Sequence, residues 1–202
     1  MCRHTTPAGH IRQDVCERTF QARRARVFAQ RGRLESRMTF MIEKMRPGHW
    51  DEVRAVYLEG LATGDATFET DAPEWERWDA THLSSCRLVA LEGARVAGWA
   101  ALSPVSARSA YAGVAEVSVY VGSPFRGMGA GRLLLSALVL ESEAAGLWTL
   151  QASVFPENVA SVVLHRECDF REVGRRERVA RGDGRWRDTV LLERRSRTVG
   201  VD

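Results

Sequence analysis

The chain has 202 residues, of which 45% are hydrophobic and 27% charged, so it is long enough for one well-cored domain with little left over. No apolar run approaches the roughly 20 residues of a membrane-spanning helix. The start MCRHTTPAGHIRQ has no apolar signal-peptide core, so we expect a cytoplasmic protein that does not enter a membrane. Its four cysteines have neither CxxC nor Cys/His ligand spacing, which predicts reduced thiols and no metal site at Cys2, Cys16, Cys86 or Cys168.

The net charge of +3 is unevenly distributed along the chain. Residues 1–37 contain nine arginines and three acidic residues, a net of +6, so the remainder carries −3. We expect 1–37 to be an Arg-rich extension, either disordered or helical through ERTFQARRARVFAQ, followed by one domain over 38–197 and a tail over 198–202. Because this arm has few aromatic residues and charge runs are more often solvated, we expect no nucleic-acid partner.

From residue 40 onward, strand and helix patterns alternate. Apolar residues at helical spacing predict an amphipathic helix after Pro47, and two apolar runs broken around Glu92 to Arg95 predict a hairpin. In chain order, the predicted elements are strand 40–46, helix 49–63, helix 72–83, strands 86–93 and 95–105, strand 115–121, helix 130–145, strand 147–155, helix 158–168, and strands 170–180 and 186–195. This order predicts a mixed α/β sheet with late crossover helices.

The stretch RGMGAG, residues 126–131, lies between the predicted strand 115–121 and the predicted helix 130–145. Its three glycines leave backbone amides uncovered at the positive end of a helix dipole, so we expect an anionic group to bind here. A P-loop is excluded, since GxxxxGK followed by Ser or Thr is absent. A dinucleotide fingerprint fails because Arg132 stands where the third glycine of GxGxxG belongs. A strand-to-helix turn without a ligand remains the alternative.

Written as R/Q-x-x-G-x-G/A, this loop resembles the acyl-CoA pyrophosphate loop of the GNAT N-acetyltransferases, with Arg126, Gly129 and Gly131 at the named positions. The resemblance implies an α/β GNAT fold, with a mixed sheet of about six or seven strands and about four helices, and acetyl-CoA as cosubstrate without a metal. Backbone amides can hold a pyrophosphate, and a pantetheine arm can bond along an opened strand. The cofactor-binding residues it implies are Val119, Tyr120, Val121, Arg126, Gly127, Met128, Gly129, Ala130, Gly131, Arg132 and Asn158. Asn158 could equally cap a helix, and the two roles are compatible.

The order and spacing of further segments resemble the phosphinothricin acetyltransferase group, which acetylates small amino acids and their analogues. The matching segments are TGDATFETDAP, SARSAYAGVAEVSVYV, SVVLHRECDF and GRWRDTVLL, and the similarity covers about residues 40 to 195. Asp169 replaces a usual Gly, which should alter only a turn, whereas Arg187 stands where His is common and could alter the substrate. Trp186 and Asp188 are expected to shape the last strands and the contact of a homodimer.

Transfer of an acetyl group to an amine needs a base, because the amine is mostly protonated at neutral pH. Glu116 matches the group's general base, with an ordinary strand-end acid as the alternative. A backbone N–H near Val119 could hold the oxyanion that develops. His165 could act as an acid toward the leaving thiolate, or could equally be a packed helix residue.

An amino-acid substrate carries a carboxylate, so its pocket should offer cations and aromatic walls. Arg108 and Tyr111 match the RxxY of the resembled group, and Phe68 lies in the loop that matches its substrate lid. Alternatively, Arg108 is solvated and the two aromatic residues only pack.

We therefore expect an amino-acid N-acetyltransferase that uses Glu116 as general base. The alternatives are a GNAT enzyme acting on an aminoglycoside, a polyamine or a protein N-terminus, and a non-catalytic CoA-binding sensor. Glu116 argues against the sensor, and the lack of an acidic tract argues against a polycationic substrate.

Overall fold

The computed structural model describes residues 39–182 and 184–201, so the predicted extension over 1–37 lies outside the described residues. Seven strands form one sheet in the order β1-β2-β3-β4-β5-β7-β6, and only β4 and β5 pair in parallel. The strands are β1 (Met41–Lys44), β2 (Arg87–Glu92), β3 (Arg95–Pro104), β4 (Val114–Val121), β5 (Thr149–Val154), β6 (Arg171–Gly182) and β7 (Arg185–Arg195). The sheet of six or seven strands that the resemblance implied is confirmed.

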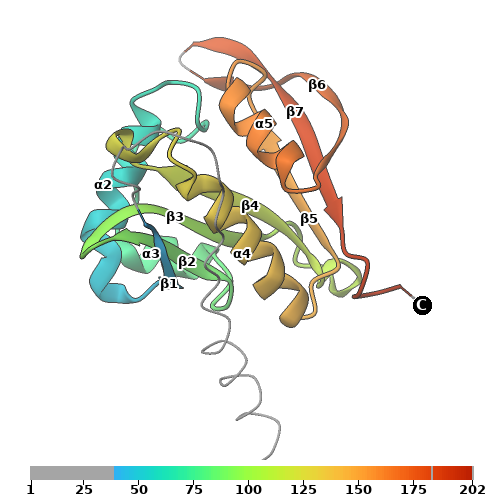
Figure 1. The fold of residues 1–202 in the computed structure, drawn as a ribbon. Coiled ribbons are helices and arrows are strands. Elements are labelled where there is room, and N and C mark those ends of the chain that lie inside the picture. The colour runs from blue at the N-terminus through green and yellow to red at the C-terminus, as the bar shows by residue number, and fades with distance from the viewer. Residues whose placement is uncertain (1–38, 183, 202) are drawn as a thin grey trace, which may run out of the picture. The chain divides into compact units, whose positions relative to one another are not determined.

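Helices pack on both faces of the sheet (Figure 1). The described α-helices are α2 (Trp50–Leu61), α3 (Trp75–Thr81), α4 (Ala130–Ala144) and α5 (Val159–Glu167), and short 3-10 turns are η1 (Pro47–His49), η2 (Ser109–Tyr111) and η3 (Ser123–Phe125). None of these helices is long and apolar enough to cross a membrane.

Strands β2 and β3 carry side chains into two hydrophobic cores. Leu88 and Leu102 face α4 in the first core, while Val89 and Trp99 face α2 and α3 in the second. Successive residues of a strand point to opposite faces, so a strand covered on both sides must be apolar throughout. This explains the continuous apolar runs of the predicted hairpin, whose pairing at Glu92↔Arg95 is confirmed.

β4 and β5 are paired only at their first residues. The parallel register runs from Val114↔Thr149 to Glu116↔Gln151, whereas β4 continues to Val121 along β3. Beyond Glu116, the side of β4 that faces away from β3 has no strand partner within residues 39–182 and 184–201. The two central strands therefore diverge and leave an open backbone edge within the sheet.

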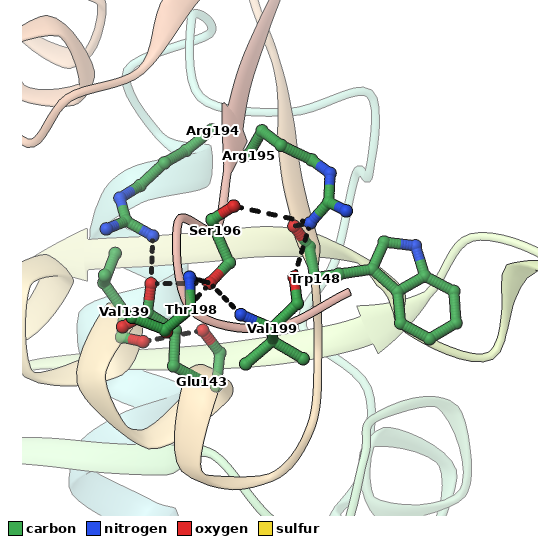
Figure 2. Close-up of polar contacts among 9 residues, drawn as sticks. Val139, Glu143, Trp148, Arg194, Arg195, Ser196, Thr198 and Val199 are labelled. Atoms are coloured by element: carbon green, nitrogen blue, oxygen red, sulfur yellow. Dashed lines mark hydrogen bonds and ion pairs between the residues drawn. The ribbon is translucent and has the colours of Figure 1, made fainter. Parts of the chain in front are cut away.

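The chain end packs against α4 and the start of β5 (Figure 2). The Glu143 carboxylate accepts hydrogen bonds from Ser196 Oγ and Arg194 Nη1, both at 3.0 Å. Arg195 Nη1 donates to the carbonyl oxygens of Trp148 and Val199, both at 2.8 Å. The predicted tail over 198–202 thus begins with residues that fold back onto the domain.

Asp188 holds an irregularity in the β6–β7 hairpin. The register shifts between Arg176 and Ala180, and Arg178 there has a φ of 46°. The Asp188 carboxylate accepts from the Arg178 backbone N–H and from Arg175 Nε, both at 2.8 Å. This side chain therefore shapes the last strands, as its motif suggested.

Substituting Asp188 by asparagine should lower the melting temperature in a pH-dependent way. The hydrogen bond from the Arg178 N–H, and then the one from Arg175, lower the pKa of Asp188. Because the ordinary value is about 3.9, the carboxylate stabilises the fold above about pH 4, and this contribution is lost as the pH falls through the lower folded-state pKa. The melting temperatures of wild type and Asp188→Asn should differ at neutral pH and become equal at acidic pH. Glu177→Gln, at an exposed position of β6, is the control. A difference in melting temperature between wild type and Asp188→Asn that does not change with pH would contradict the prediction.

Candidate active site

The open edge of β4 presents the backbone of Val119. Gly122 N–H donates to the Ala97 carbonyl at 2.9 Å. Because backbone groups alternate along an antiparallel pair, Tyr120 also bonds toward β3, while Val119 and Val121 point away from it. The Val121 carbonyl accepts from Arg126 Nε at 3.1 Å. Val119 is thus left with an N–H and a carbonyl that face the gap between β4 and β5.

The side chain of Tyr120 is directed away from this gap. Its ring stacks on Trp99, with ring centres 4.7 Å apart, and packs edge-on against Tyr57. Burial raises the pKa of Tyr120. Of the three strand residues that the resemblance implied for the cofactor, Val119 is therefore the one whose N–H and carbonyl both face the gap without a partner among the described residues.

The glycines of the loop between β4 and α4 serve different purposes. Gly127 and Gly129 have φ values of 76° and 93°, a region that side chains rarely tolerate. Gly131 has no such backbone, but a Cβ there would lie 3.3 Å from Leu164 and 3.4 Å from Val121. The first two glycines allow the turn, and the third lets α4 pack closely on β4 and α5.

The start of α4 offers a row of hydrogen-bond donors. Gly129 precedes the helix, and no side chain of the described part of the chain caps it. The first backbone amides of a helix have no partner within the helix, and the loop contacts of the described residues supply none to Gly129, Ala130, Gly131 or Arg132. Four amides at the positive end of a 15-residue helix suit an anion such as a pyrophosphate. The loop and the open edge of β4 therefore fit the two parts of acetyl-CoA, its pyrophosphate and its extended arm.

Three charged or exposed side chains flank this loop. Arg126 bonds to the Val121 carbonyl and, at 3.4 Å, to that of Glu59, so its guanidinium holds the loop against β4 and α2. Arg132 forms a 3.7 Å ion pair with Glu167 of α5. Met128 is exposed.

Asn158 joins α5 to the segment after α2. Its Oδ1 accepts from Ser161 N–H at 3.1 Å, which makes it the N-cap of α5. Its Nδ2 donates to the Asp65 carbonyl at 3.1 Å. The capping alternative for Asn158 is thus what the structure describes.

Glu116 lies where β4 leaves β5. It is half-buried, between Ser103 on β3 and Gln151 on β5. Within residues 39–182 and 184–201, no hydrogen bond or ion pair engages its carboxylate. The carboxylate is three residues from Val119 on the same strand, which suits a base that acts through one or two waters.

His165 is buried within α5, with an exposed fraction of 2%. Its Nδ1 lies 2.8 Å from the Ser161 carbonyl, and desolvation lowers the pKa of the ring. Only a protonated Nδ1 can donate to that carbonyl, so the neutral ring carries its hydrogen there and Nε2 has none. In this state the side chain packs against Phe170, 5.0 Å between ring centres, and has no free proton to give.

A cavity of about 330 Å³ lies beside the segment between α2 and α3. Phe68 lines it and packs edge-on against Phe155, with ring centres 4.7 Å apart. The residues that line it are Leu58, Leu61, Ala62, Gly64, Thr67, Phe68, Glu69, Thr70, Phe155, Gly182 and Arg187. Apolar walls with a few hydroxyl and charged groups suit a small polar molecule.

Arg108 and Tyr111 lie apart from this cavity. Arg108 directly precedes η2 and Tyr111 is its last residue, so both lie before the first residue of β4, and both are exposed. Neither they nor Glu116 line the cavity that holds Phe68. The structure therefore does not bring the three predicted substrate residues together in one chain.

Sequence reasoning missed the contacts around Arg187. This side chain bonds to Asp65 and Glu157, neither of which the sequence suggested. The signal in the sequence is the arginine at a position where His is common, which by itself does not indicate these contacts. Cys86 and Cys168 are buried free thiols, and the described residues contain no cluster of three His, Cys, Asp or Glu side chains that could hold a metal.

Comparison with known proteins places this geometry in a family. Residues 50–170 match the model of the acetyltransferase (GNAT) family. A phosphinothricin N-acetyltransferase of Alcaligenes faecalis is 31% identical over 169 residues, which cover 79% of this chain and 84% of that protein. An L-methionine sulfoximine/L-methionine sulfone acetyltransferase of Pseudomonas paraeruginosa is 36% identical over 107 residues, or 52% of this chain and 62% of that protein.

A solved structure is similar over most of the described fold. The crystal structure of a GNAT superfamily phosphinothricin acetyltransferase from Sinorhizobium meliloti, in complex with acetyl-CoA, superposes with a TM-score of 0.74 at 27% identity. The match covers 82% of this chain and 92% of that one. Because the family model matches more than half of this chain, the chain belongs to the GNAT family of N-acetyltransferases.

Proposed function

We propose that the protein transfers an acetyl group from acetyl-CoA to the amine of a small amino acid or amino-acid analogue. The observation that carries this proposal is the open edge of β4, where the free backbone of Val119 lies between the glycine loop and the unengaged carboxylate of Glu116. The named activities of the relatives support the choice of an amino-acid acceptor.

The two ends of the open edge would bind acetyl-CoA and activate the amine, respectively. The amides of Gly129 to Arg132 would hold the pyrophosphate, and the backbone of Val119 would bond to the arm or to the oxygen on which negative charge develops. Acetyl-CoA supplies an acetyl group activated as a thioester. Glu116 would take a proton from the acceptor ammonium through water, which leaves the amine free to attack.

His165 is better suited to packing than to catalysis. A buried, neutral ring whose single N–H is directed at the Ser161 carbonyl cannot protonate a leaving group. A thiolate is a sufficiently weak base to leave without that help. We therefore assign His165 to the core of α5 and leave Glu116 as the proposed catalytic side chain.

Three further side chains would bind the acceptor. Phe68 would form one wall of the acceptor cavity. Arg108 and Tyr111 lie outside that cavity within one chain, so they would meet the substrate carboxylate only where it extends beyond the cavity. We propose a cytoplasmic homodimer, since the resembled group implies a dimer and the cytoplasm supplies acetyl-CoA.

A substrate comparison tests the amino-acid assignment. Methionine sulfone and phosphinothricin should release free thiol from acetyl-CoA, whereas spermidine and aminoglycosides should not. The carboxamide of methionine sulfone keeps the amine but loses the charge that Arg108 would meet. Because Arg108 is exposed, its pairing is worth about 1 kcal/mol, so kcat/KM for the acid should exceed that for the amide about fivefold.

Arg108→Gln should abolish this preference by slowing only the acid. Arg166→Gln, at another exposed arginine, is the control and should leave the ratio unchanged. Equal efficiency for acid and amide in wild type would defeat the amino-acid assignment and leave the acetyltransferase family standing.

A further inference from the structure

Arg187 on β7 is the only Arg, Lys, Asp or Glu side chain that is buried among the described residues, with an exposed fraction of 5%. Burying a charge is costly unless other groups compensate it. The groups that surround Arg187 therefore indicate why the charge is kept there.

The guanidinium is engaged on three sides. Nη1 donates to the Gly64 carbonyl at 2.9 Å, and Nη2 donates to Asp65 Oδ1 at 2.8 Å and to Glu157 Oε2 at 3.3 Å. Its central carbon lies 4.0 Å from the ring centre of Phe155, a cation–π distance. The hydrogen bond to Asp65 raises the pKa of Arg187, a side chain that is charged in any case. Three of the five N–H groups of the guanidinium are thus engaged by the protein, whereas Nε has no hydrogen-bond partner among the described residues.

These contacts fix a segment that has no regular structure of its own. Between Leu61 and Trp75 the chain forms neither helix nor strand. Asp65 in this segment is held twice: Arg187 binds its carboxylate, and Asn158 Nδ2 binds its carbonyl at 3.1 Å. The segment is thus attached to β7 on one side and to the start of α5 on the other.

The same segment supplies one wall of the 330 Å³ cavity. Thr67, Phe68, Glu69 and Thr70 line it within a few residues of Asp65. Phe155, which lies under the Arg187 guanidinium, also packs against Phe68. The position of the Phe68 wall therefore depends on where Arg187 holds Gly64 and Asp65.

We propose that Arg187 is a positioning residue that fixes the segment 62–70 in the shape that receives the acceptor amine. The proposal rests on the proposed function, because the cavity is an acceptor site only if the protein acetylates an amine. The planar fork of arginine meets a carbonyl and two carboxylates while its face lies on an aromatic ring, an arrangement that the single ammonium of lysine cannot reproduce.

The test compares Arg187→Met, Arg187→Lys and Asp65→Asn with wild type. Asp65→Asn is the mild variant, because it keeps the shape of a half-exposed side chain and removes only its charge. Arg166→Met is the matched control, since it removes an exposed 2.5 Å ion pair between Arg166 on α5 and Glu172 on β6. Hydrogen exchange of peptides from residues 62–70 should become about tenfold faster in Arg187→Met and remain unchanged in the control.

Steady-state kinetics provide the second readout. The KM for the acceptor amine should rise about 10- to 100-fold in Arg187→Met, with kcat and the KM for acetyl-CoA within about threefold of wild type. Arg187→Lys should recover only part of the loss, and adding Asp65→Asn to Arg187→Met should cost little more, because both act on one contact.

Several results would overturn the proposal. The proposal fails if hydrogen exchange in residues 62–70 is unchanged in Arg187→Met. It also fails if exchange there is faster but the KM for the amine is unchanged, or if the faster exchange extends equally through α4. The exchange measurement needs no substrate. If wild type acetylates no amine, the proposed function fails, and the attachment of the segment by Arg187 is still decided by the exchange data.

Discussion

Replacing Glu116 by glutamine is expected to lower kcat about 10²- to 10⁴-fold, with the KM for acetyl-CoA within about threefold of wild type. Glutamine keeps the shape of the side chain and cannot accept a proton. The acceptor would then react only through the small fraction that is already a free amine. The deficit should narrow as the pH rises, because that fraction grows. Initial rates of thiol release across a pH series measure both effects.

Glu193 offers a matched control for Glu116. It lies in the same row of the sheet, since Glu116 pairs with Gln151 and Gln151 pairs with Glu193. Its carboxylate is engaged by Arg171 at 2.6 Å, whereas no described side chain engages that of Glu116. Glu193→Gln should therefore retain kcat within about threefold. Equal losses in the two variants, or a Glu116→Gln rate that matches wild type at every pH, would mean that another group accepts the proton.

Replacing Gly129 by aspartate should abolish the stabilisation of the protein by acetyl-CoA. At a concentration of about 100 times Kd, a ligand stabilises the native state by about 2.7 kcal/mol, which corresponds to roughly 5 to 10 °C in a domain of this size. A carboxylate at position 129 would occupy the place of the pyrophosphate beside the α4 amides and repel it. Thermal melts with acetyl-CoA, in the presence of a chelator, measure the shift, and ATP or NAD should give none.

Backbone strain needs its own control in this experiment, because Gly129 has a φ of 93°. Gly129→Ala introduces the strain without the charge and should keep part of the shift. Gly93→Asp places the same side chain at another glycine of positive φ, in the β2–β3 turn, and should keep the full shift. A normal acetyl-CoA shift in Gly129→Asp would remove the glycine loop from the proposed binding site, and a shift that requires a metal would indicate a different ligand.

The order of the elements could be predicted from the sequence because each rests on local patterns. The helical spacing after Pro47 became α2, and the turn near Glu92 closed the β2–β3 hairpin. Asp169 illustrates the same kind of local rule: it replaces a usual Gly, and its φ of 66° is one that Asp tolerates better than most residues. The glycine loop was also found locally, since a run of glycines between a strand and a helix is a contiguous motif.

The roles of individual side chains could be predicted less well. The sequence allows His165 to be either a proton donor or a packed residue, and the choice depends on the Ser161 carbonyl and on burial in the folded chain. The resemblance predicts one substrate pocket for Phe68, Arg108 and Tyr111, but neither Arg108 nor Tyr111 lines the cavity that Phe68 lines. A one-dimensional pattern gives the order of such residues and does not give the distances among them.

By itself, the sequence determined the mixed α/β class, the chain order of its strands and helices, and a glycine loop suited to an anion, because hydrophobic periodicity and backbone-permissive glycines act over a few neighbouring residues. Only the tertiary structure decided that β4 and β5 diverge after Glu116 and Gln151, which frees the Val119 backbone. It also decided that Arg187 is buried against Asp65, 122 positions away in the sequence. Strand divergence and the pairing of a buried charge depend on which distant segments meet, and no local pattern carries that information.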